Sequence, residues 1–124
     1  MAFLMDSNLI IYACQANNQE LRNWVIHNNP IVSIISKIET MGYHRIKAAE
    51  KLLLEALFEA AVVLPLTDAI AETAIALRQQ KSMTLGDALI AATAIEHRLS
   101  LATANTKDFE HIENLLVVNP LTAH

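Results

Sequence analysis

The chain has 124 residues, of which 53% are hydrophobic and 18% are charged, and its formal net charge at pH 7 is −4. This length suits one domain over residues 1–124, and the high hydrophobic content excludes an intrinsically disordered chain. The negative charge argues against a protein that bulk charge alone holds on nucleic acid, but it does not exclude a nucleic-acid enzyme.

The apolar runs and the cysteine content indicate the cellular compartment of the protein and its relation to membranes. No apolar run approaches the 18 residues of a transmembrane helix, and the N-terminus lacks the pattern of a signal peptide. The single cysteine, Cys14, excludes an internal disulfide and suits a reducing compartment. We therefore expect a cytoplasmic protein without a membrane partner.

The first half of the chain alternates short apolar runs with amphipathic stretches. In chain order it predicts a strand, two short helices, a second strand and a long helix, over residues 3–5, 9–16, 18–27, 31–35 and 36–60. Ser36 and Glu39 fit a capping box at the start of the long helix, which is expected to break near Gly42. Its expected inner face holds Ile46, Ala49, Leu53, Ala56, Leu57 and Ala60, and Leu52 and Leu54 widen that face.

The second half continues the alternation of strands and helices. It predicts a strand, two helices, a strand, a helical turn and a strand, over residues 61–64, 67–80, 84–98, 99–103, 107–112 and 115–118. Thr67 and Thr84 are the expected caps of the two helices. Strands separated by helices predict a three-layer α/β/α domain, with a parallel sheet of about five strands and helices on both faces.

Acidic residues follow predicted strands or open predicted helices at four points. These are Asp6, Glu39, Asp87 and the turn that contains Asn105 and Asp108. Each acid alone also has a structural explanation, because carboxylates cap helices and favour their N-termini. Together they are expected to meet, since the carboxyl ends of parallel strands lie at one edge of the sheet.

Gathered carboxylates repel one another unless a cation lies among them. Hard oxygen ligands suit Mg²⁺ or Mn²⁺, and such an ion can activate water and stabilise charge on a phosphate. Metal-dependent phosphodiester hydrolysis is the expected chemistry. The five histidines lack zinc-ligand spacing, and the sequence has neither a glycine-rich phosphate loop nor a nucleophile elbow.

Four segments resemble the PIN domain family, and more closely the VapC-type toxins of prokaryotic toxin–antitoxin pairs. Ser7 and Ser36 stand where that family usually has threonine, and the resemblance covers nearly the whole chain. The segments are residues 5–10, 33–39, 86–94 and 101–109.

The resemblance implies a ribonuclease that depends on Mg²⁺ or Mn²⁺. In that family pattern Asp6 and Asp87 are the principal metal ligands, and Glu39 completes the site directly or by orienting water. The fourth position is open between two residues, of which we favour Asp108 as the acid. The residues implied in supporting roles are Asn105, Thr103 and Ser7.

The resemblance also implies an RNA substrate, a cognate antitoxin that covers the cleft, and a homodimer. Two alternatives remain. One is an inactive PIN-like binding or scaffold module, and the other is a PIN nuclease of RNA processing outside a toxin–antitoxin system. The complete acid set argues against a scaffold, which has no need to gather carboxylates that repel one another. Arg45, Lys47 and Lys51 fit either an RNA contact or a solvated helix face.

Overall fold

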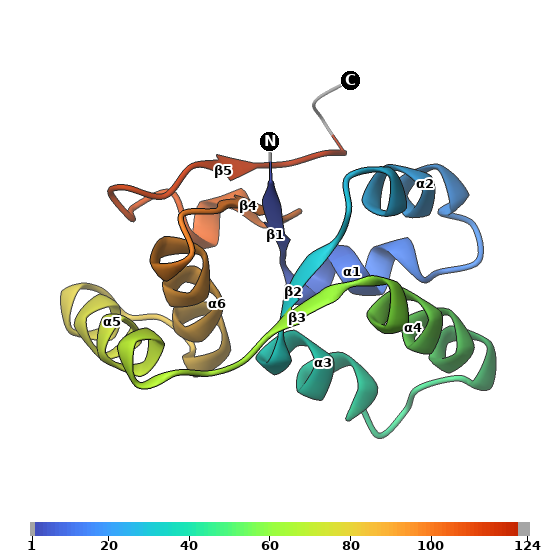
Figure 1. The fold of residues 1–124 in the computed structure, drawn as a ribbon, viewed down its shortest axis with the longest axis horizontal. Helices are drawn as coiled ribbons and strands as arrows, with labels where there is room; N and C mark the ends of the chain where they lie inside the picture. The colour runs from blue at the N-terminus through green and yellow to red at the C-terminus, as the bar shows by residue number, and fades with distance from the viewer. Residues whose placement is uncertain (1, 122–124) are drawn as a thin grey trace.

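The computed structural model describes residues 2–121, and within them five strands form one parallel sheet (Figure 1). The strand order is β3-β2-β1-β4-β5, so the first strand of the chain lies at the centre. The strands are β1 (Phe3–Met5), β2 (Ile31–Ser33), β3 (Val62–Leu64), β4 (Ser100–Ala102) and β5 (Val117–Val118).

Helices cover both faces of this sheet. The helices are α1 (Ser7–Ala13), α2 (Gln19–His27), α3 (Ile34–Met41), α4 (Ala48–Ala60), α5 (Asp68–Gln80), α6 (Leu85–Glu96) and a short 3₁₀ helix, η1 (Thr106–Asp108). In Figure 1, α5 and α6 lie on one side of β1, and α1, α2 and α4 lie on the other. The predicted three-layer α/β/α fold with a five-stranded parallel sheet is therefore confirmed.

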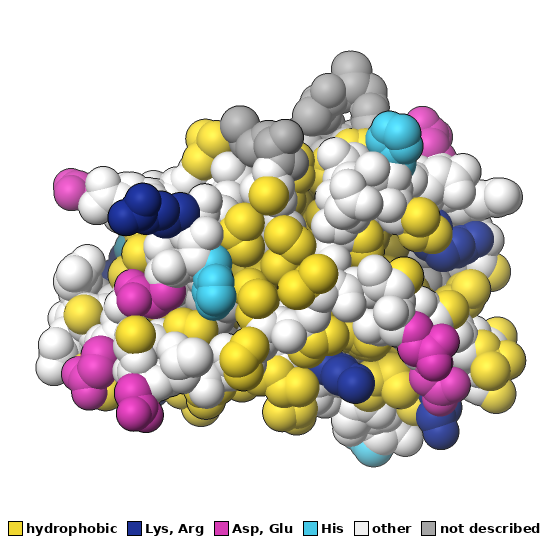
Figure 2. Space-filling model, in the orientation of Figure 1, with side chains coloured by type: hydrophobic (Ala, Val, Ile, Leu, Met, Phe, Trp, Pro, Cys, Tyr) yellow, Lys and Arg dark blue, Asp and Glu magenta, His cyan; other side chains and the backbone are white. Residues whose placement is uncertain are grey.

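Two apolar clusters hold the layers together, because successive strand residues point to opposite faces of a sheet. Leu4 of β1 and Leu101 of β4 are fully buried in the cluster that contains α5 and α6. Their neighbours Met5 and Ala102 are fully buried in the cluster that contains α1, α2 and α4. Figure 2 shows hydrophobic side chains across the middle of one face of the molecule, with charged side chains towards its sides.

The register of the central strands brings their carboxyl ends to one edge. Leu4 pairs with Ile31 of β2 and with Leu101 of β4. The backbone N–H of Asp6 then donates to the carbonyl of Ala102 over 2.9 Å, which continues the pairing one residue beyond β1. Asp6 consequently lies at the end of the central strand, where ligands bind in sheets of this type.

The predicted capping box of Ser36 and Glu39 is wrong. The second strand ends at Ser33, and the Ser33 hydroxyl caps α3 by accepting from the backbone N–H of Ile35 over 3.0 Å. Ser36 therefore lies inside the helix and is fully buried. Two serines three residues apart could each open the helix, and the earlier one does so.

The long predicted helix breaks near Gly42, as expected, into α3 and α4. The predicted inner face of α4 is only partly right, because Leu57 is buried but Ala49, Ala56 and Ala60 are exposed. Of the two residues expected to widen the face, Leu54 is buried and Leu52 is exposed, and Phe58, which was not expected there, is buried as well. Leucine and phenylalanine side chains remove more apolar area from water than alanine does, so α4 turns most of these larger side chains toward the core. No helix within residues 2–121 combines the length and hydropathy needed to cross a lipid bilayer.

Leu101→Ala tests the assigned core. Because Leu101 is fully buried between β1 and the α5–α6 layer, the substitution should lower the free energy of unfolding by about 2–5 kcal/mol. Leu52→Ala is the matched control, since Leu52 is 67% exposed, and it should change stability by less than about 0.5 kcal/mol. Urea unfolding measures both, and equal losses would contradict the assigned core.

Candidate active site

Asp6 is the most buried carboxyl group at the edge of the sheet, with 2% of its surface exposed. One oxygen, Oδ1, accepts from the backbone N–H of Ser7 over 2.8 Å, so Asp6 also caps α1. The other oxygen, Oδ2, accepts from the hydroxyl of Thr103 over 2.7 Å. Since Thr103 follows β4, two neighbouring strands fix the orientation of this carboxylate.

The Ser7 hydroxyl joins the first turn of α1 to α3. It lies 2.8 Å from Oε1 of Glu39 and 2.9 Å from the hydroxyl of Ser36. A carboxylate can only accept, so Ser7 donates to Glu39 and accepts from Ser36. This chain of hydrogen bonds holds Glu39 next to the helix start that carries Asp6, although Glu39 itself is exposed.

Gly86 makes the space in which the Glu39 carboxylate lies. A Cβ atom at Gly86 would be only 2.6 Å from Oε2 of Glu39. Glu39 therefore rests against the first turn of α6, where Asp87 is the next residue. Considered as an isolated glycine, Gly86 predicted nothing about the site. The segment 86–94 that resembles the PIN domain family begins with Gly86, but the resemblance assigned this glycine no role at the site.

Burial and mutual repulsion raise the pKa values of two of these acids. Desolvation is the largest cause for Asp6, whose pKa Asp87 and Glu39 raise further, while the bonds from Thr103 and Ser7 lower it. Desolvation also leads for Asp87, whose pKa is raised by Asp108 and Glu39 and lowered by a hydrogen bond with Thr84. No basic side chain is among the causes for either group.

The four predicted acids are thus coupled electrostatically, but their side chains do not close around one point. Within residues 2–121, no three His, Cys, Asp or Glu side chains come together closely enough to form a metal site. Asp108 lies in η1 and is exposed, and Asn105 contributes a backbone N–H that donates to the Thr103 hydroxyl over 3.0 Å.

The donor set nevertheless fits a divalent cation. All four acids offer hard oxygen ligands, and a cation would relieve the repulsion that adds to desolvation in raising the pKa values of Asp6 and Asp87. A cluster of this kind favours binding of Mg²⁺ or Mn²⁺ over binding of an anion.

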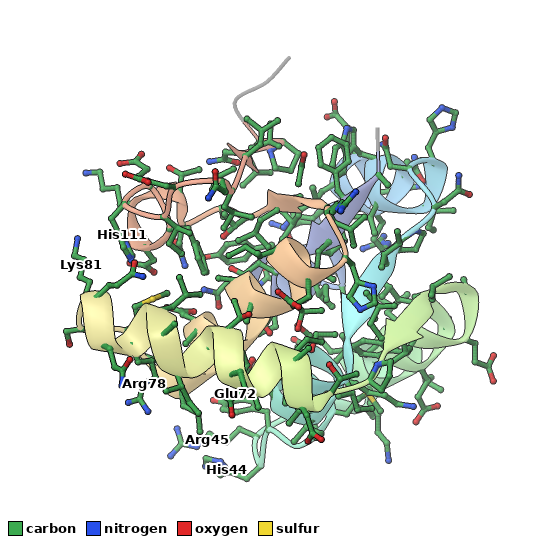
Figure 3. The ribbon with its side chains drawn as sticks, turned by 60° about the vertical axis from the view of Figure 1, so that its left-hand side comes forward. His44, Arg45, Glu72, Arg78, Lys81 and His111 are labelled. Carbon is green, nitrogen blue, oxygen red and sulfur yellow. The ribbon has the colours of Figure 1, made fainter. Side chains whose placement is uncertain are left out.

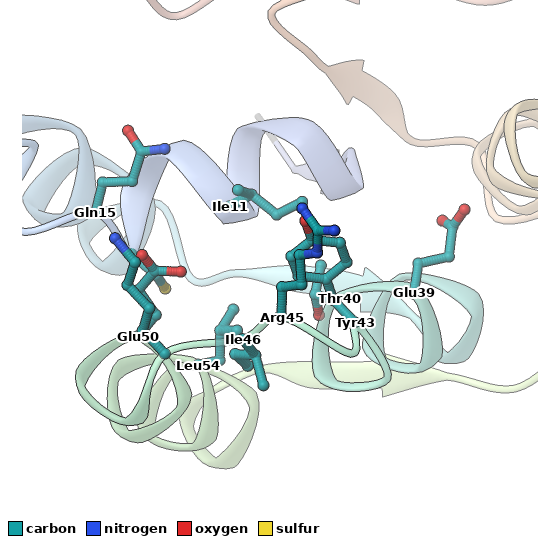
Figure 4. A pocket seen from close by; sticks show the side chains of 11 residues that line it. Ile11, Gln15, Glu39, Thr40, Tyr43, Arg45, Ile46, Glu50 and Leu54 are labelled. Atoms are coloured by element: carbon teal, nitrogen blue, oxygen red, sulfur yellow. The ribbon is translucent and has the colours of Figure 1, made fainter.

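Cavities open on two sides of this acid cluster. One of about 500 Å³ extends from Glu39 between α1, α3 and α4 (Figure 4). Ile11, Ile46 and Leu54 give it an apolar lining, while Arg45 lies between Ile11 and Glu39 in this view. The other, of about 260 Å³, is lined by residues of η1 and of the first turn of α6.

The raised pKa values predict how stability depends on pH without metal. An acid whose pKa is higher in the folded protein binds more protons when folded, so its contribution falls as pH rises. The contribution of Asp6 and Asp87 should be greatest below the ordinary value of 3.8 and be lost as pH rises through their higher folded-state pKa values.

Urea unfolding in the presence of a chelator, from acidic to neutral pH, measures this dependence. Asp87→Asn should flatten it, because one of the two groups no longer titrates and its charge no longer acts on Asp6. Asp68→Asn is the matched control, since Asp68 is an exposed acid in the first turn of α5, and it should leave the slope unchanged. An Asp87→Asn slope equal to that of the wild type would contradict the assignment.

Comparisons with known proteins agree with this geometry. The model of the PIN domain family matches residues 3–115. A chain of a toxin–antitoxin complex from Klebsiella pneumoniae is 31% identical, with a TM-score of 0.79 over 96% of this chain and 98% of that chain. No curated protein sequence matches.

Two further solved structures share the fold at lower identity. A chain of DNA-bound VapBC from Salmonella typhimurium is 20% identical, with a TM-score of 0.80 over 95% of this chain and 97% of that chain. A chain of VapBC2 from Rickettsia felis, bound to a DNA fragment from their promoter, is 21% identical, with a TM-score of 0.78 over 96% and 98%. The family match covers most of the sequence and confirms the predicted resemblance, and the chain therefore belongs to the PIN domain family.

Proposed function

We propose that this protein is a metal-dependent endoribonuclease, the VapC-type toxin of a toxin–antitoxin pair, which hydrolyses RNA phosphodiester bonds in the cytoplasm. The observation that carries the proposal is the buried Asp6 carboxylate at the end of the central strand. Burial raises its pKa, Asp87 and Glu39 raise it further, and no basic side chain is among the causes. Membership of the PIN domain family supports the same chemistry.

In this proposal Asp6 and Asp87 are the principal ligands of Mg²⁺ or Mn²⁺, and Glu39 and Asp108 complete the site. The bound ion would lower the pKa of a water molecule and stabilise negative charge on the phosphate. The acids approach from four separate segments of the chain, so the fold rather than local sequence gathers them.

The hydroxyl groups around the acids give the site its rigidity. The Thr103 hydroxyl and the Ser7 backbone N–H donate to the two oxygens of Asp6, and the Ser7 hydroxyl donates to one oxygen of Glu39, so the orientation of each carboxylate is fixed. Partners of this kind orient metal ligands and tune their basicity. Asn105 supports the set through Thr103, whose hydroxyl it contacts.

A cognate antitoxin and a homodimer belong to the same proposal. The chain is 31% identical to a chain of a toxin–antitoxin complex, which supports an antitoxin partner. The cavity that starts at Glu39 has an apolar part formed by Ile11, Ile46 and Leu54, and an antitoxin segment placed there would reach the acid cluster at Glu39. A second copy of the chain would pack on large apolar side chains that are exposed outside this cavity. Examples are Leu66, just before α5, and Ile75, within α5.

Asp87→Asn tests the metal site. The wild type should be stabilised by Mn²⁺, because a ligand selective for the folded state adds about 2.7 kcal/mol at a hundred times its Kd. Asp87→Asn should lose most of that gain and all RNA cleavage, while keeping the fold without metal. Thermal unfolding with and without Mn²⁺, beside a panel of RNA substrates, measures both effects.

Asp68→Asn again serves as the matched control and should behave as the wild type. A fully active Asp87→Asn protein would contradict the metal assignment. A wild type that neither gains stability from Mn²⁺ nor cleaves RNA would identify an inactive PIN-like binding module instead.

Expression in a bacterial host tests the toxin assignment. The wild type should arrest growth and produce new RNA fragments, whereas Asp87→Asn should do neither because it lacks a metal ligand. Growth curves and total RNA are followed together, with soluble folded protein verified in both cultures. Normal growth with active, folded wild type would favour a PIN nuclease of RNA processing.

A further inference from the structure

The cavity of about 260 Å³ is lined by both acidic and basic side chains. Asp87 and Asp108 line it, and Lys81, Lys107 and His111 line it as well. The whole chain has only nine Lys and Arg residues, so two lysines and a histidine at one small cavity are a local concentration of basic groups. Figure 3 shows Lys81 and His111 near each other at the C-terminal end of α5.

His111 is partly buried, and its ring nitrogens have no partner within residues 2–121. Neither of its ring nitrogens has a hydrogen-bond partner among the described residues, and both are shielded from solvent. A buried polar atom without a partner costs stability, so such an atom in a folded protein calls for a specific reason. Whichever tautomer His111 adopts, at least one ring nitrogen carries a hydrogen to donate.

The two lysines are also unengaged. Lys81 and Lys107 are exposed, and neither side chain forms an ion pair or hydrogen bond within residues 2–121. Lys81 directly follows the last residue of α5, where a positive charge interacts favourably with the helix dipole. That effect explains Lys81 but gives no reason for Lys107 or for the unpartnered His111.

We propose that Lys81, Lys107 and His111 bind a backbone phosphate of the RNA strand, adjacent to the phosphate that is cleaved at Asp87 and Asp108. This inference rests on the proposed nuclease function, because it takes Asp87 and Asp108 as part of the reaction site. The lysines supply positive charge, and His111 supplies an N–H donor once its ring turns toward the bound phosphate. A strand that crosses the cavity brings one phosphate to the acids and its neighbour to the basic groups.

This phosphate site would position the strand without reading its sequence, because phosphate contacts carry no base information. Losing one of these lysines should therefore weaken RNA binding to the same degree for unrelated sequences. It should also make binding less sensitive to salt, because fewer counterions are released.

Binding of two unrelated single-stranded oligoribonucleotides, followed by fluorescence anisotropy over a range of salt, tests the proposal. A chelator is present, so that metal-dependent cleavage does not run. Lys81→Gln and Lys107→Gln should each weaken the binding of both oligonucleotides several-fold. Each should also reduce the magnitude of the slope of log K against log salt by about 0.7. Lys37→Gln, an exposed lysine of α3 that does not line this cavity, is the matched control and should leave affinity and slope unchanged.

A second arm titrates inorganic phosphate and follows the ring-nitrogen NMR signals of His111. These signals should shift and saturate in the wild type, and the shift should weaken in Lys107→Gln. His111→Leu should bind phosphate and RNA more weakly yet unfold at a higher temperature, because it removes the unpartnered nitrogens. A purely structural histidine would not show this opposition.

Unchanged affinity and salt slope in Lys81→Gln and Lys107→Gln, or no measurable binding of either probe, would overturn the proposal. If phosphate binds at His111 but RNA affinity does not depend on the two lysines, the part of the proposal that concerns RNA is overturned. Failure of the nuclease is seen separately, as lysine-dependent RNA binding without any Mn²⁺-dependent cleavage. Normal cleavage with lysine-independent binding would count against this site alone.

Discussion

The burial of Asp6 at the end of the central strand is the constraint on which the site depends. Burial disfavours the charged carboxylate, and the nearby Asp87 and Glu39 disfavour it further. The bonds from Thr103 and Ser7 offset only part of this cost. The sheet thus holds a carboxylate where its own surroundings oppose its charge, which is a feature of functional sites.

The fold follows from this sequence because its local signals agree with one another. Short apolar runs alternate with amphipathic stretches, and Thr67 and Thr84 cap the helices that they were expected to cap. Chain connectivity then requires parallel strands, whose carboxyl ends share an edge. For that reason the acids at strand ends and helix starts could be placed near one another before their geometry was known.

Several details of the site could not be read from the sequence. They depend on which of two similar residues makes a contact, or on how separate elements pack together. Ser33 caps α3, and this frees Ser36 to join the hydrogen bonds around Ser7. The space that Gly86 leaves for Glu39 exists only when α3 and α6 pack together. Likewise, the unpartnered His111 emerges only when η1 folds against the start of α6.

The most direct test of the account is anomalous diffraction from crystals of the wild-type protein soaked in Mn²⁺. We expect an anomalous peak that places a manganese ion about 2.1 Å from carboxylate oxygens of both Asp6 and Asp87, the distance typical of small divalent cations. The same soak of Asp87→Asn should lose that peak. An empty acid cluster in fully soaked wild-type crystals, or a manganese ion bound only elsewhere, would contradict the central claim.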